Sequence, residues 1–412
     1  MGLRIRDGKL APEGERKIDW AASHMPVLGA VTEQLIQAGS LQGVRVGVCL
    51  HLEAKTACLA LALQRAGAVV SITGSNPLST QDDVCAGLAG RGVSVYAWHA
   101  PTPEEYRGFL REVLDDDPQL LLDDGADMIT LLHAERADRV DRVRGATEET
   151  TTGVLRLRAM ATDGALRFPV VAVNDAKMKY LFDNRYGTGQ SVWEGVLRAT
   201  NLLLAGKQVL VVGYGWCGRG VALRAQGLGA RVTVAEVDPI AANEALLEGL
   251  AVRRAVDAVA DADFIITCTG DRGVIAEEHL LRCKDGAVLA NAGHFNVEVD
   301  TVALERMALG RQLVRPNVEE FRLPNGRRLN LLAEGRLVNL AAGDGHPAEI
   351  MDISFALQAL SLAWIAAADA EPGVLDVPPG LDREVARLRL AATGAEVDEL
   401  TASQRAYLHS WR

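Results

Sequence analysis

Apolar positions along the chain change between two spacings, and the change predicts strands that alternate with helices. After a polar leader, residues 18–37 carry apolar side chains at helical spacing. Short apolar runs and longer amphipathic runs then follow one another. The predicted strands are residues 44–50, 68–73, 93–96, 120–122 and 170–173, and the predicted helices between them are residues 53–66, 81–89 and 104–114. Such alternation is typical of a parallel sheet with helices on both faces.

The same alternation returns in the second half of the chain. Strands are predicted at residues 209–212, 232–235, 264–268 and 287–290, and a long apolar helix at residues 351–368. At 412 residues the chain exceeds what one hydrophobic core usually supports. We therefore expect an α/β protein with two doubly wound parallel-sheet domains. The predicted limits are residues 1–184 with 347–400 for the first domain, 190–346 for the second domain and 401–412 for a short tail, with hinges near residues 184–190 and 346–350.

The most informative motif is a glycine turn, G-x-G-x-x-G at Gly213, Gly215 and Gly218, between a predicted strand and a helical run from Val221. The glycines allow a tight turn and a close approach of the backbone to a pyrophosphate, which the N-terminus of the helix attracts. Glu236 ends the next strand, where a carboxylate binds both ribose hydroxyls and repels a 2′-phosphate. A glycine-rich turn that binds nothing is the alternative, and the surrounding strand, helix and acid disfavour it. The second domain is therefore predicted to be a Rossmann domain that binds NAD rather than NADP.

Polar or small residues also follow other predicted strands, at the edge where open parallel sheets bind ligands. In the first domain they are His51, residues 74–76, Asp123 and Asp124, and in the second domain they are Thr269, Asn291 and Gly293. Small residues there would let a cofactor approach the backbone. His294 comes next, and from its spacing it could equally be a core histidine.

Two polar segments have both a structural and a functional interpretation. Residues 145–153, GATEETTTG, have a composition that most often forms a solvated turn. Lys179 and Asp183 are four residues apart, so on a helix they share one face. The alternative is an ordinary surface ion pair, which the spacing alone does not exclude.

Composition and charge exclude several classes of partner. The chain has 49% hydrophobic residues and a net charge of −11 at pH 7. The lack of an overall positive field argues against nucleic acid and anionic membranes, and leaves small molecules in local pockets. The six cysteines are scattered, so neither a zinc site nor a disulfide framework is expected. The first 25 residues are too charged for a signal peptide, no run of about 18 apolar residues follows them, and we expect a cytoplasmic protein.

Several long motifs together resemble the S-adenosyl-L-homocysteine hydrolase family over nearly the whole chain. They are His51 after a strand, STQD at 79–82, LDDGAD at 122–127, EETTTG at 148–153, NDxxxKxxFDN at 174–184, the glycine turn, NAGHF at 291–295 and AEGRLVNL at 333–340. The resemblance implies an enzyme in which bound NAD oxidises the 3′-hydroxyl of the substrate to a ketone, which acidifies the C4′ proton. Homocysteine is then eliminated, water adds to the enone and the ketone is reduced, so NAD is regenerated in each turnover.

The resemblance implies a role for each catalytic residue. Lys179 and Asp183 would act on the 3′-hydroxyl, with Lys179 a base only if burial or a neighbouring cation lowers its pKa. Asp124 would handle the C4′ proton. His51 would act as acid and base at the departing sulfur and the incoming water.

The remaining matches lie around the substrate and the cofactor. Glu149 and His294 would contact the reacting sugar and complete the catalytic set, and His346 would lie near the base and homocysteine. Further cofactor contacts would come from Thr150, Thr151, Thr152, Asn184 and Asn339. The resemblance also implies a homotetramer, and it makes the first domain, residues 1–184 with 347–400, the substrate-binding domain.

Three features depart from the usual family pattern. Trp216 and Arg219 stand where the glycine turn usually has Asp and Lys, and they leave the phosphate-binding glycines intact. Thr188 replaces a cysteine often found after the FDN motif, so a thiol at that position cannot be essential. The sequence ends at Arg412 without the longer Lys- and Tyr-containing tail that many members extend into a neighbouring subunit's cofactor site, which leaves the tightness of NAD binding open.

The nucleoside base is predicted to depend on Glu53, Lys55 and Thr56 in HLEAKTA. Most of the family has a hydroxyl residue in place of Glu53 and an acceptor in place of Lys55, where it takes the 6-amino group of adenine. Lys55 can only donate, which suits the 6-oxo group of hypoxanthine, and Glu53 could accept from its N1–H. Both could instead be surface residues of the first helical turn, which fits Glu53 but not Lys55, since a cation there opposes the helix dipole. Residues two apart also do not share a helix face, which weighs against a joint role. We predict the adenosyl substrate, because HLEAKTA also occurs in a bacterial and archaeal branch of adenosyl hydrolases. The inosyl substrate is the alternative.

Two other functions fit the glycine turn. A simple NAD-dependent dehydrogenase would consume free NAD as product forms. A non-catalytic nucleotide-binding regulator would have lost the catalytic residues, and their joint presence argues against it.

Overall fold

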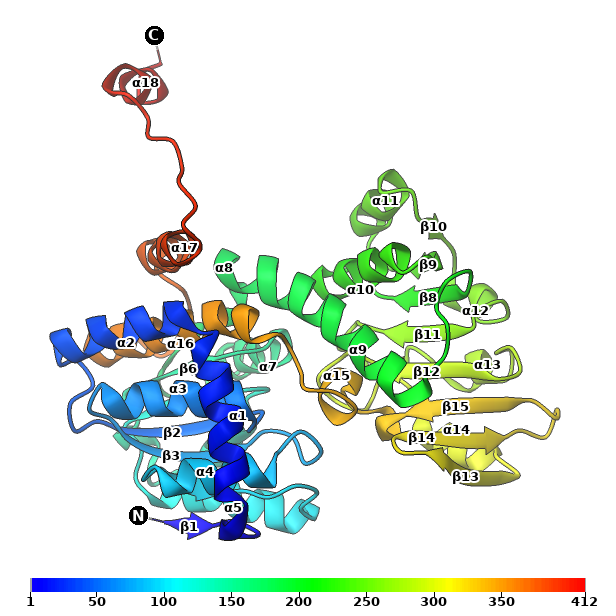
Figure 1. Ribbon diagram of the computed structural model, residues 1–412, viewed down its shortest axis with the longest axis horizontal. Helices are drawn as coiled ribbons and strands as arrows, with labels where there is room; N and C mark the ends of the chain where they lie inside the picture. The colour runs from blue at the N-terminus through cyan, green and yellow to red at the C-terminus, as the bar shows by residue number, and fades with distance from the viewer. Residues whose placement is uncertain (1, 412) are drawn as a thin grey trace.

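The computed structural model describes residues 2–411 and contains two eight-stranded sheets, each covered by helices on both faces (Figure 1). All strand pairs of the first sheet are parallel. Its order is β1 (Leu3–Arg4), β4 (Ser94–Tyr96), β3 (Val69–Gly74), β2 (Arg45–Leu50), β5 (Leu120–Asp123), β6 (Gly145–Glu148), β7 (Pro169–Ala172) and β16 (Gly373–Asp376). The strand order reverses between β2 and β5, which is where such sheets bind ligands.

The second sheet has a parallel part and an antiparallel edge. Its order is β10 (Ala251–Val252), β9 (Arg231–Ala235), β8 (Gln208–Val212), β11 (Phe264–Thr267), β12 (Ala287–Asn291), β15 (Arg328–Leu332), β14 (Val318–Arg322) and β13 (Gly310–Arg315). Strand β14 is antiparallel to both of its neighbours. The order reverses between β8 and β11, so the loops after these two strands face the second ligand position. The predicted α/β class with two doubly wound sheets is confirmed.

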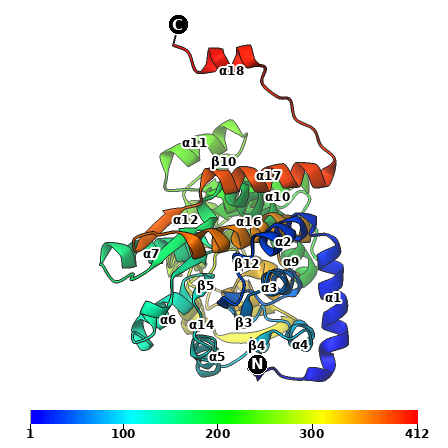
Figure 2. The same cartoon turned by 90° about the vertical axis from the view of Figure 1, so that its left-hand side faces the viewer.

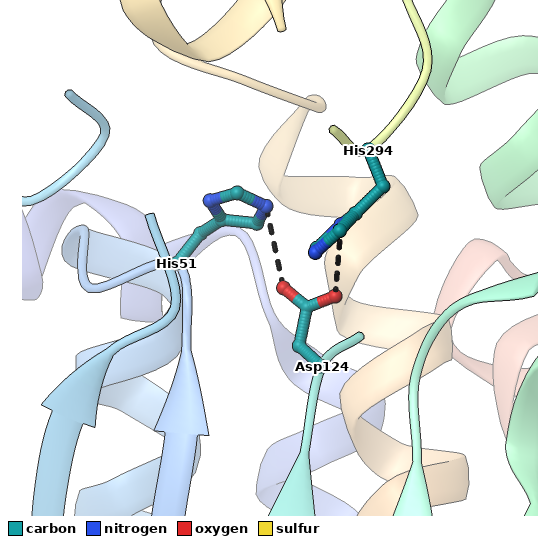
Figure 3. Close-up of side chains that lie close together, drawn as sticks. All are labelled: His51, Asp124 and His294. Atoms are coloured by element: carbon teal, nitrogen blue, oxygen red, sulfur yellow. Dashed lines mark ion pairs between the residues drawn. The ribbon is translucent and has the colours of Figure 1, made fainter. Parts of the chain in front are cut away.

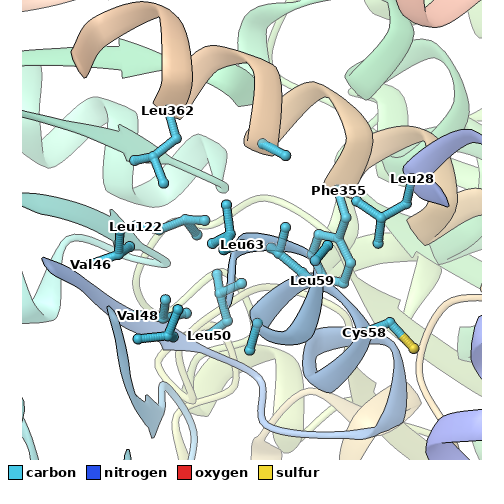
Figure 4. Packing of buried hydrophobic residues seen from close by; sticks show 14 of the residues in the cluster. Leu28, Val46, Val48, Leu50, Cys58, Leu59, Leu63, Leu122, Phe355 and Leu362 are labelled. Atoms are coloured by element: carbon cyan, nitrogen blue, oxygen red, sulfur yellow. The ribbon is translucent and has the colours of Figure 1, made fainter. Parts of the chain in front are cut away.

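The helices of the first sheet enclose its core from both faces. On one face, α1 (Ala11–Ser23), α2 (Pro26–Ala38), α3 (Ala54–Arg65), α4 (Asp82–Gly90) and α16 (Ala348–Ala367) pack; on the other are α5 (Pro103–Asp115), α6 (Asp127–Glu135) and α7 (Thr151–Thr162). Figure 4 shows Leu59 and Leu63 of α3 between the strand residue Val48 and Phe355 of α16. The apolar helix near the C-terminus therefore completes a core that begins near the N-terminus.

The second sheet is covered in the same way. One face carries α9 (Thr188–Thr200), α10 (Trp216–Gly227) and α11 (Pro239–Leu247), and the other carries α12 (Ala255–Ala258), α13 (Glu277–Leu280) and α14 (Thr301–Met307). The chain enters this sheet through α8 (Lys177–Lys179), a π-helical segment (Tyr180–Gly187) and α9. It returns through α15 (Val338–Ala341) to α16. The domain limits given by the sequence stay predictions.

Several elements differ from those predicted. Residues 18–37 are not one helix, because Pro26 has no N–H for the preceding turn and begins the separate helix α2. Helix α10 begins at Trp216, before the predicted Val221, so Gly218 lies inside it. Strands β13 and β14 were not predicted, since their apolar and charged residues do not alternate regularly.

Two helices near the C-terminus stand out. By length and composition α16 could cross a membrane, and 61% of its most apolar window is buried inside the protein. Core helices pass the same test. After α17 (Pro379–Thr393), the exposed helix α18 (Ala402–Leu408) stands away from the rest of the molecule (Figures 1 and 2).

Candidate active site

A cavity of about 350 Å³ lies where the carboxyl ends of the two sheets meet. Both sheets and both connections between them contribute to its lining. The predicted residues that line it are His51, Glu53, Lys55, Thr56, Asp124, Glu149, Thr150, Thr151, Thr152, Lys179, Asp183, Asn184, Gly215, Thr269, Gly293, His294, Asn339 and His346. Gly213, Gly218, Glu236 and Asn291 are the predicted residues outside this lining. The two positions at which the strand order reverses, one in each sheet, therefore face the same cavity.

Asp124 is shared by two histidines in this cavity (Figure 3). His51 follows β2 and Asp124 follows β5, so the parallel pairing brings His51 Nε2 within 3.2 Å of Asp124 Oδ2. His294 arrives from the loop after β12 in the other sheet, with Nδ1 3.5 Å from Asp124 Oδ1. Its ring covers Gly125, where a side chain would collide with it. The interpretation of His294 as a histidine of the core alone is therefore wrong.

Hydrogen bonds from two serines orient this group. Ser75 Oγ donates to Asp124 at 2.8 Å, and Ser79 Oγ lies 2.7 Å from His51 Nδ1. Burial lowers the pKa of His51 to about 4, although Asp124 opposes the shift. His51 is therefore a neutral imidazole at neutral pH. It can accept a proton before it gives one.

The ligand atoms of His51, Asp124 and His294 lie within 4.8 Å of one another and are the one such group among residues 2–411 that could hold a metal ion. Each imidazole is already at ion-pair distance from a carboxylate oxygen, which acid/base chemistry also requires. The absence of a metal stays a prediction.

Lys179 is the centre of a second buried group. Its Nζ lies 3.5 Å from Glu149 Oε1 and from Asp183 Oδ1, and it donates to Asn184 Oδ1 at 2.9 Å. Because Lys179 and Asp183 are only 4% and 3% exposed, the interpretation as a surface ion pair is wrong. Burial alone would lower the pKa of Lys179, but Asp183 and Glu149 hold it above its ordinary value. The condition stated above for Lys179 to act as a base, a lowered pKa, is therefore not met.

The two carboxylates beside Lys179 differ in protonation. Burial raises the pKa of Glu149 to about 7, and Lys179 only partly offsets it. Burial also disfavours the charged form of Asp183, but Lys179 and His346 outweigh it and lower the pKa. His346 Nδ1 is 2.9 Å from Asp183 Oδ1, and Ser354 Oγ donates to the other oxygen at 2.7 Å. Glu149 is thus the group near Lys179 that can take up a proton at neutral pH.

The segment 145–153 is not a solvated turn. Its first half is the buried strand β6, and its second half begins α7 with Thr150 as the capping residue. Glu148, which sequence reasoning missed, accepts hydrogen bonds from Gly125 N, Ala126 N and Thr150 N. Burial raises the pKa of Glu148 well above its ordinary value. The Glu148 side chain therefore fixes the loop that carries Asp124. Only its position directly before the polar run ETTT could have indicated this role from the sequence.

The glycine turn has the geometry that a dinucleotide needs. Gly213 has φ +95°, and a Cβ there would lie 2.9 Å from Thr269 Cγ2. A Cβ on Gly218 would collide with the Gly213 carbonyl, whereas one on Gly215 meets no described atom within 4 Å. Gly213 therefore allows the turn, and Gly218 allows the helix to pack closely against it. Gly215 leaves room for a ligand. Glu236 is held beside the turn, because Tyr214 N, Val237 N and Asp238 N donate to its carboxylate.

The loops after β11 and β12 complete the cofactor side. Glu298, another residue that sequence reasoning missed, accepts from Thr269 N at 2.9 Å and Gly270 N at 2.8 Å. Asn291 is fully buried and bonds the backbone of its own loop, so it positions Gly293 rather than lining the cavity. Asn339 lines the cavity, and its buried Oδ1 has no hydrogen-bond partner among the described residues. The residues present therefore fit NAD, with an acceptor left for a polar group of the ligand.

Glu53 and Lys55 are not surface residues, since they are 4% and 8% exposed. Glu53 precedes α3 and accepts from Lys55 N at 3.1 Å and Thr56 N at 3.3 Å. Lys55 Nζ turns back to Glu53 Oε2 at 2.7 Å and donates to the Asp344 carbonyl at 2.8 Å. The pair therefore meets in spite of its i, i+2 spacing, because Glu53 lies outside the helix.

Comparison with known proteins gives one family for both halves. Family models described as "S-adenosyl-L-homocysteine hydrolase" and "S-adenosyl-L-homocysteine hydrolase, NAD binding domain" match residues 2–141 and 184–345. The S-inosyl-L-homocysteine hydrolase of Methanothermobacter thermautotrophicus is 54% identical over 100% of this chain and 99% of its own length. The adenosylhomocysteinase of Pyrococcus abyssi is 54% identical over 99% of this chain and 97% of its own length.

A solved structure shares the fold at low sequence identity. One of the dipicolinate synthase chains of Bacillus halodurans superposes with a TM-score of 0.50 at 15% identity, over 80% of this chain and 100% of that chain. The relatives and the two family models carry the assignment. The chain belongs to the S-adenosyl-L-homocysteine hydrolase family, and NAD is its cofactor.

Proposed function

We propose that this protein hydrolyses S-adenosyl-L-homocysteine to adenosine and L-homocysteine, reversibly and with NAD that is regenerated in each turnover. The observation that carries the proposal is the meeting of two proton-handling groups, around Asp124 and around Lys179, in one cavity beside the glycine turn. When bound, NAD supplies the oxidation and reduction of the 3′-carbon. The protein's own groups move the protons and position the sugar.

We infer an order for the proton steps. Lys179 is protonated at rest, so it can take the proton of the 3′-hydroxyl only as its own proton moves to the carboxylate of Glu149, whose pKa of about 7 lets it hold that proton. Asp183, held charged by Lys179 and His346, orients that lysine. Asp124 takes the C4′ proton and returns it after water has added, and neutral His51 accepts a proton from the attacking water and delivers it to the homocysteine sulfur. In the reverse direction the same groups work in the opposite order.

A homocysteine-release assay without added NAD tests the proposal. We expect product to form continuously in the absence of free NAD, whereas a simple dehydrogenase would need NAD in proportion to product, and a regulator would release none. Glu149→Gln should slow the appearance of reduced nicotinamide by about a hundredfold or more, because Lys179 loses its proton acceptor. Asp124→Asn should still form reduced nicotinamide but release no homocysteine. A Glu149→Gln variant that oxidises the sugar at the parental rate would contradict the assigned order.

S-inosyl-L-homocysteine is the second candidate substrate, and Lys55 is the observation in its favour. An ammonium group has three N–H donors. Two of those on Lys55 contact Glu53 and Asp344, which leaves one for a ligand in the cavity. A donor suits the 6-oxo group of hypoxanthine, and relatives with both names are equally similar to this chain.

Competition between S-adenosyl-L-homocysteine and S-inosyl-L-homocysteine at equal concentration decides between the substrates. An unpaired buried polar group discriminates by up to about 10⁴. Preference for the inosyl substrate that Lys55→Gln reverses would support the second candidate. Strong preference for the adenosyl substrate, unchanged in Lys55→Gln, would exclude it. Lys9→Gln, on the exposed surface, is the matched control.

We infer that the protein is a cytoplasmic homotetramer without nucleic-acid or membrane partners. The net charge of −11 supports the absence of nucleic acid. Apolar side chains exposed on α11 and α18, such as Ile240 and Tyr407, support association of copies. Light scattering of the eluting protein measures the mass, and a monomer would contradict the inference.

A further inference from the structure

Trp216 contacts two other side chains at the edge of the cofactor cavity. It is the first residue of α10 and lines the cavity next to Gly215. The ring of Tyr180 lies beside the indole, with centroids 5.0 Å apart and planes tilted by 31°. The guanidinium of Arg219 lies over the indole, 4.6 Å from its centroid. The three groups form a stack, called here the Tyr180–Trp216–Arg219 stack.

The stack joins two parts of the chain that serve different steps. Tyr180 directly follows Lys179 and begins the π-helical segment, which also contains Asp183. Trp216 begins the helix whose N-terminus faces the pyrophosphate position. A π-turn is often found at a functional site, and here it aims Tyr180 at α10. The catalytic lysine segment and the phosphate-binding helix are therefore in direct contact.

Both layers beside the indole are fixed by further contacts. Arg219 donates to the Tyr214 carbonyl at 3.2 Å and pairs with Glu244, so its charge cannot leave the ring freely. One turn along α10, a Cβ on Gly220 would collide with the Arg185 carbonyl, which shows that the π-helical segment and α10 touch through their backbones. A residue with these neighbours can move only if the segment and the helix separate.

We propose that Trp216 retains the cofactor: the stack holds the first turn of α10 against the π-helical segment, so that NAD leaves only after this contact opens. The proposal rests on the NAD-dependent function above but not on which nucleoside is hydrolysed. An aromatic contact and a cation over an indole each contribute modestly and add together in a partly buried site. Their loss should speed NAD release about five- to twentyfold.

The test measures the exchange of bound radiolabelled NAD against excess unlabelled NAD in the whole protein. Trp216→Leu and Tyr180→Leu should each release label about five- to twentyfold faster, while Trp216→Phe, which keeps a ring in the stack, should stay within about threefold of the parent. Trp20→Leu changes an exposed tryptophan on α1 and should have no effect. Because the two rings act together, the double variant should release label no faster than the faster single variant.

Several outcomes would overturn the proposal. Release at the parental rate in Trp216→Leu, slower release, or effects of the two substitutions that multiply would each show that the stack does not retain NAD. If Trp216→Leu fails to fold, Tyr180→Leu gives the same test from the other side of the contact. A parent protein that holds NAD but hydrolyses neither S-adenosyl- nor S-inosyl-L-homocysteine would contradict the proposed function alone. A parent protein that binds no NAD would contradict the proposed function and the role of the stack.

Discussion

Buried ionisable side chains in this protein owe their protonation to their neighbours. Glu149 and Asp183 both contact Lys179, yet the pKa of one is raised to about 7 and that of the other is lowered. Asp183 gains His346 and Ser354 as partners, whereas Glu149 receives a hydrogen bond from the neutral Gln358. The contacts with His346 and Ser354 therefore separate Asp183, which stays an anion, from Glu149, which can accept a proton.

The buried neutral His51 should make stability depend on pH. Its pKa falls from 6.5 to about 4 on folding, so below about pH 6.5 the unfolded chain binds a proton that the folded protein does not. Stability from this group is complete above pH 6.5 and is lost as the pH falls towards 4. Between pH 7 and pH 5 we expect a loss of about 2 kcal/mol. Urea unfolding of the parent and of His51→Asn at both values measures it.

The His51→Asn variant is the control for every other titrating group. An asparagine side chain cannot be protonated, so the variant should lose about 2 kcal/mol less than the parent over the same interval. Equal losses would show that the folded protein does protonate His51 near pH 6.

At the scale of elements, strands and their polar ends were predictable, but the groups that hold the loops were not. The strand-end rule placed His51 and Asp124 together, because it needs only the local alternation of strands and helices. Glu148 and Glu298 escaped, because they act on backbone groups 22 to 29 residues away that no local pattern connects. The π-helical turn escaped as well, since Lys179 and Asp183 have a spacing that suits an ordinary helix.

The three glycines of the turn should respond differently to alanine. A Cβ on Gly218 collides with a carbonyl, so Gly218→Ala should reduce the free energy of unfolding by about 1–3 kcal/mol. Gly215 has φ −67° and open space, so Gly215→Ala should unfold within about 1 kcal/mol of the parent. The same alanine should weaken NAD binding, because its methyl group occupies the space that faces the ligand. Urea unfolding without NAD and NAD titration separate the two effects. Gly215→Ala with parental affinity would contradict the assigned role.

At the scale of the molecule, the two ends of the chain hold one domain together. Asp352 of α16 is fully buried and accepts from Val27 N at 3.0 Å and Leu28 N at 2.7 Å at the start of α2. Strand β16 then pairs with β7 at the edge of the first sheet. The first sheet is therefore built from segments on both sides of the second one.

Asp352→Ala should test this connection. The substitution leaves two buried N–H groups of α2 without a partner, so we expect the free energy of unfolding to fall by about 1–3 kcal/mol. Glu349→Ala removes an exposed carboxylate from the same helix and should change it by less than about 0.5 kcal/mol. Similar effects of the two substitutions would contradict a special role for Asp352.

The placement of β16 also has a consequence for synthesis on the ribosome. The second sheet has all of its strands once residue 332 has emerged, whereas the first sheet waits for residue 376 although its first strand begins at residue 3. Until α16 arrives, the apolar side chains of α2 and α3 lack the part of their cover that this helix gives, which makes the nascent chain prone to aggregation. A ribosome that stalls between these two positions would carry a folded cofactor domain attached to an incomplete first domain with exposed apolar surface.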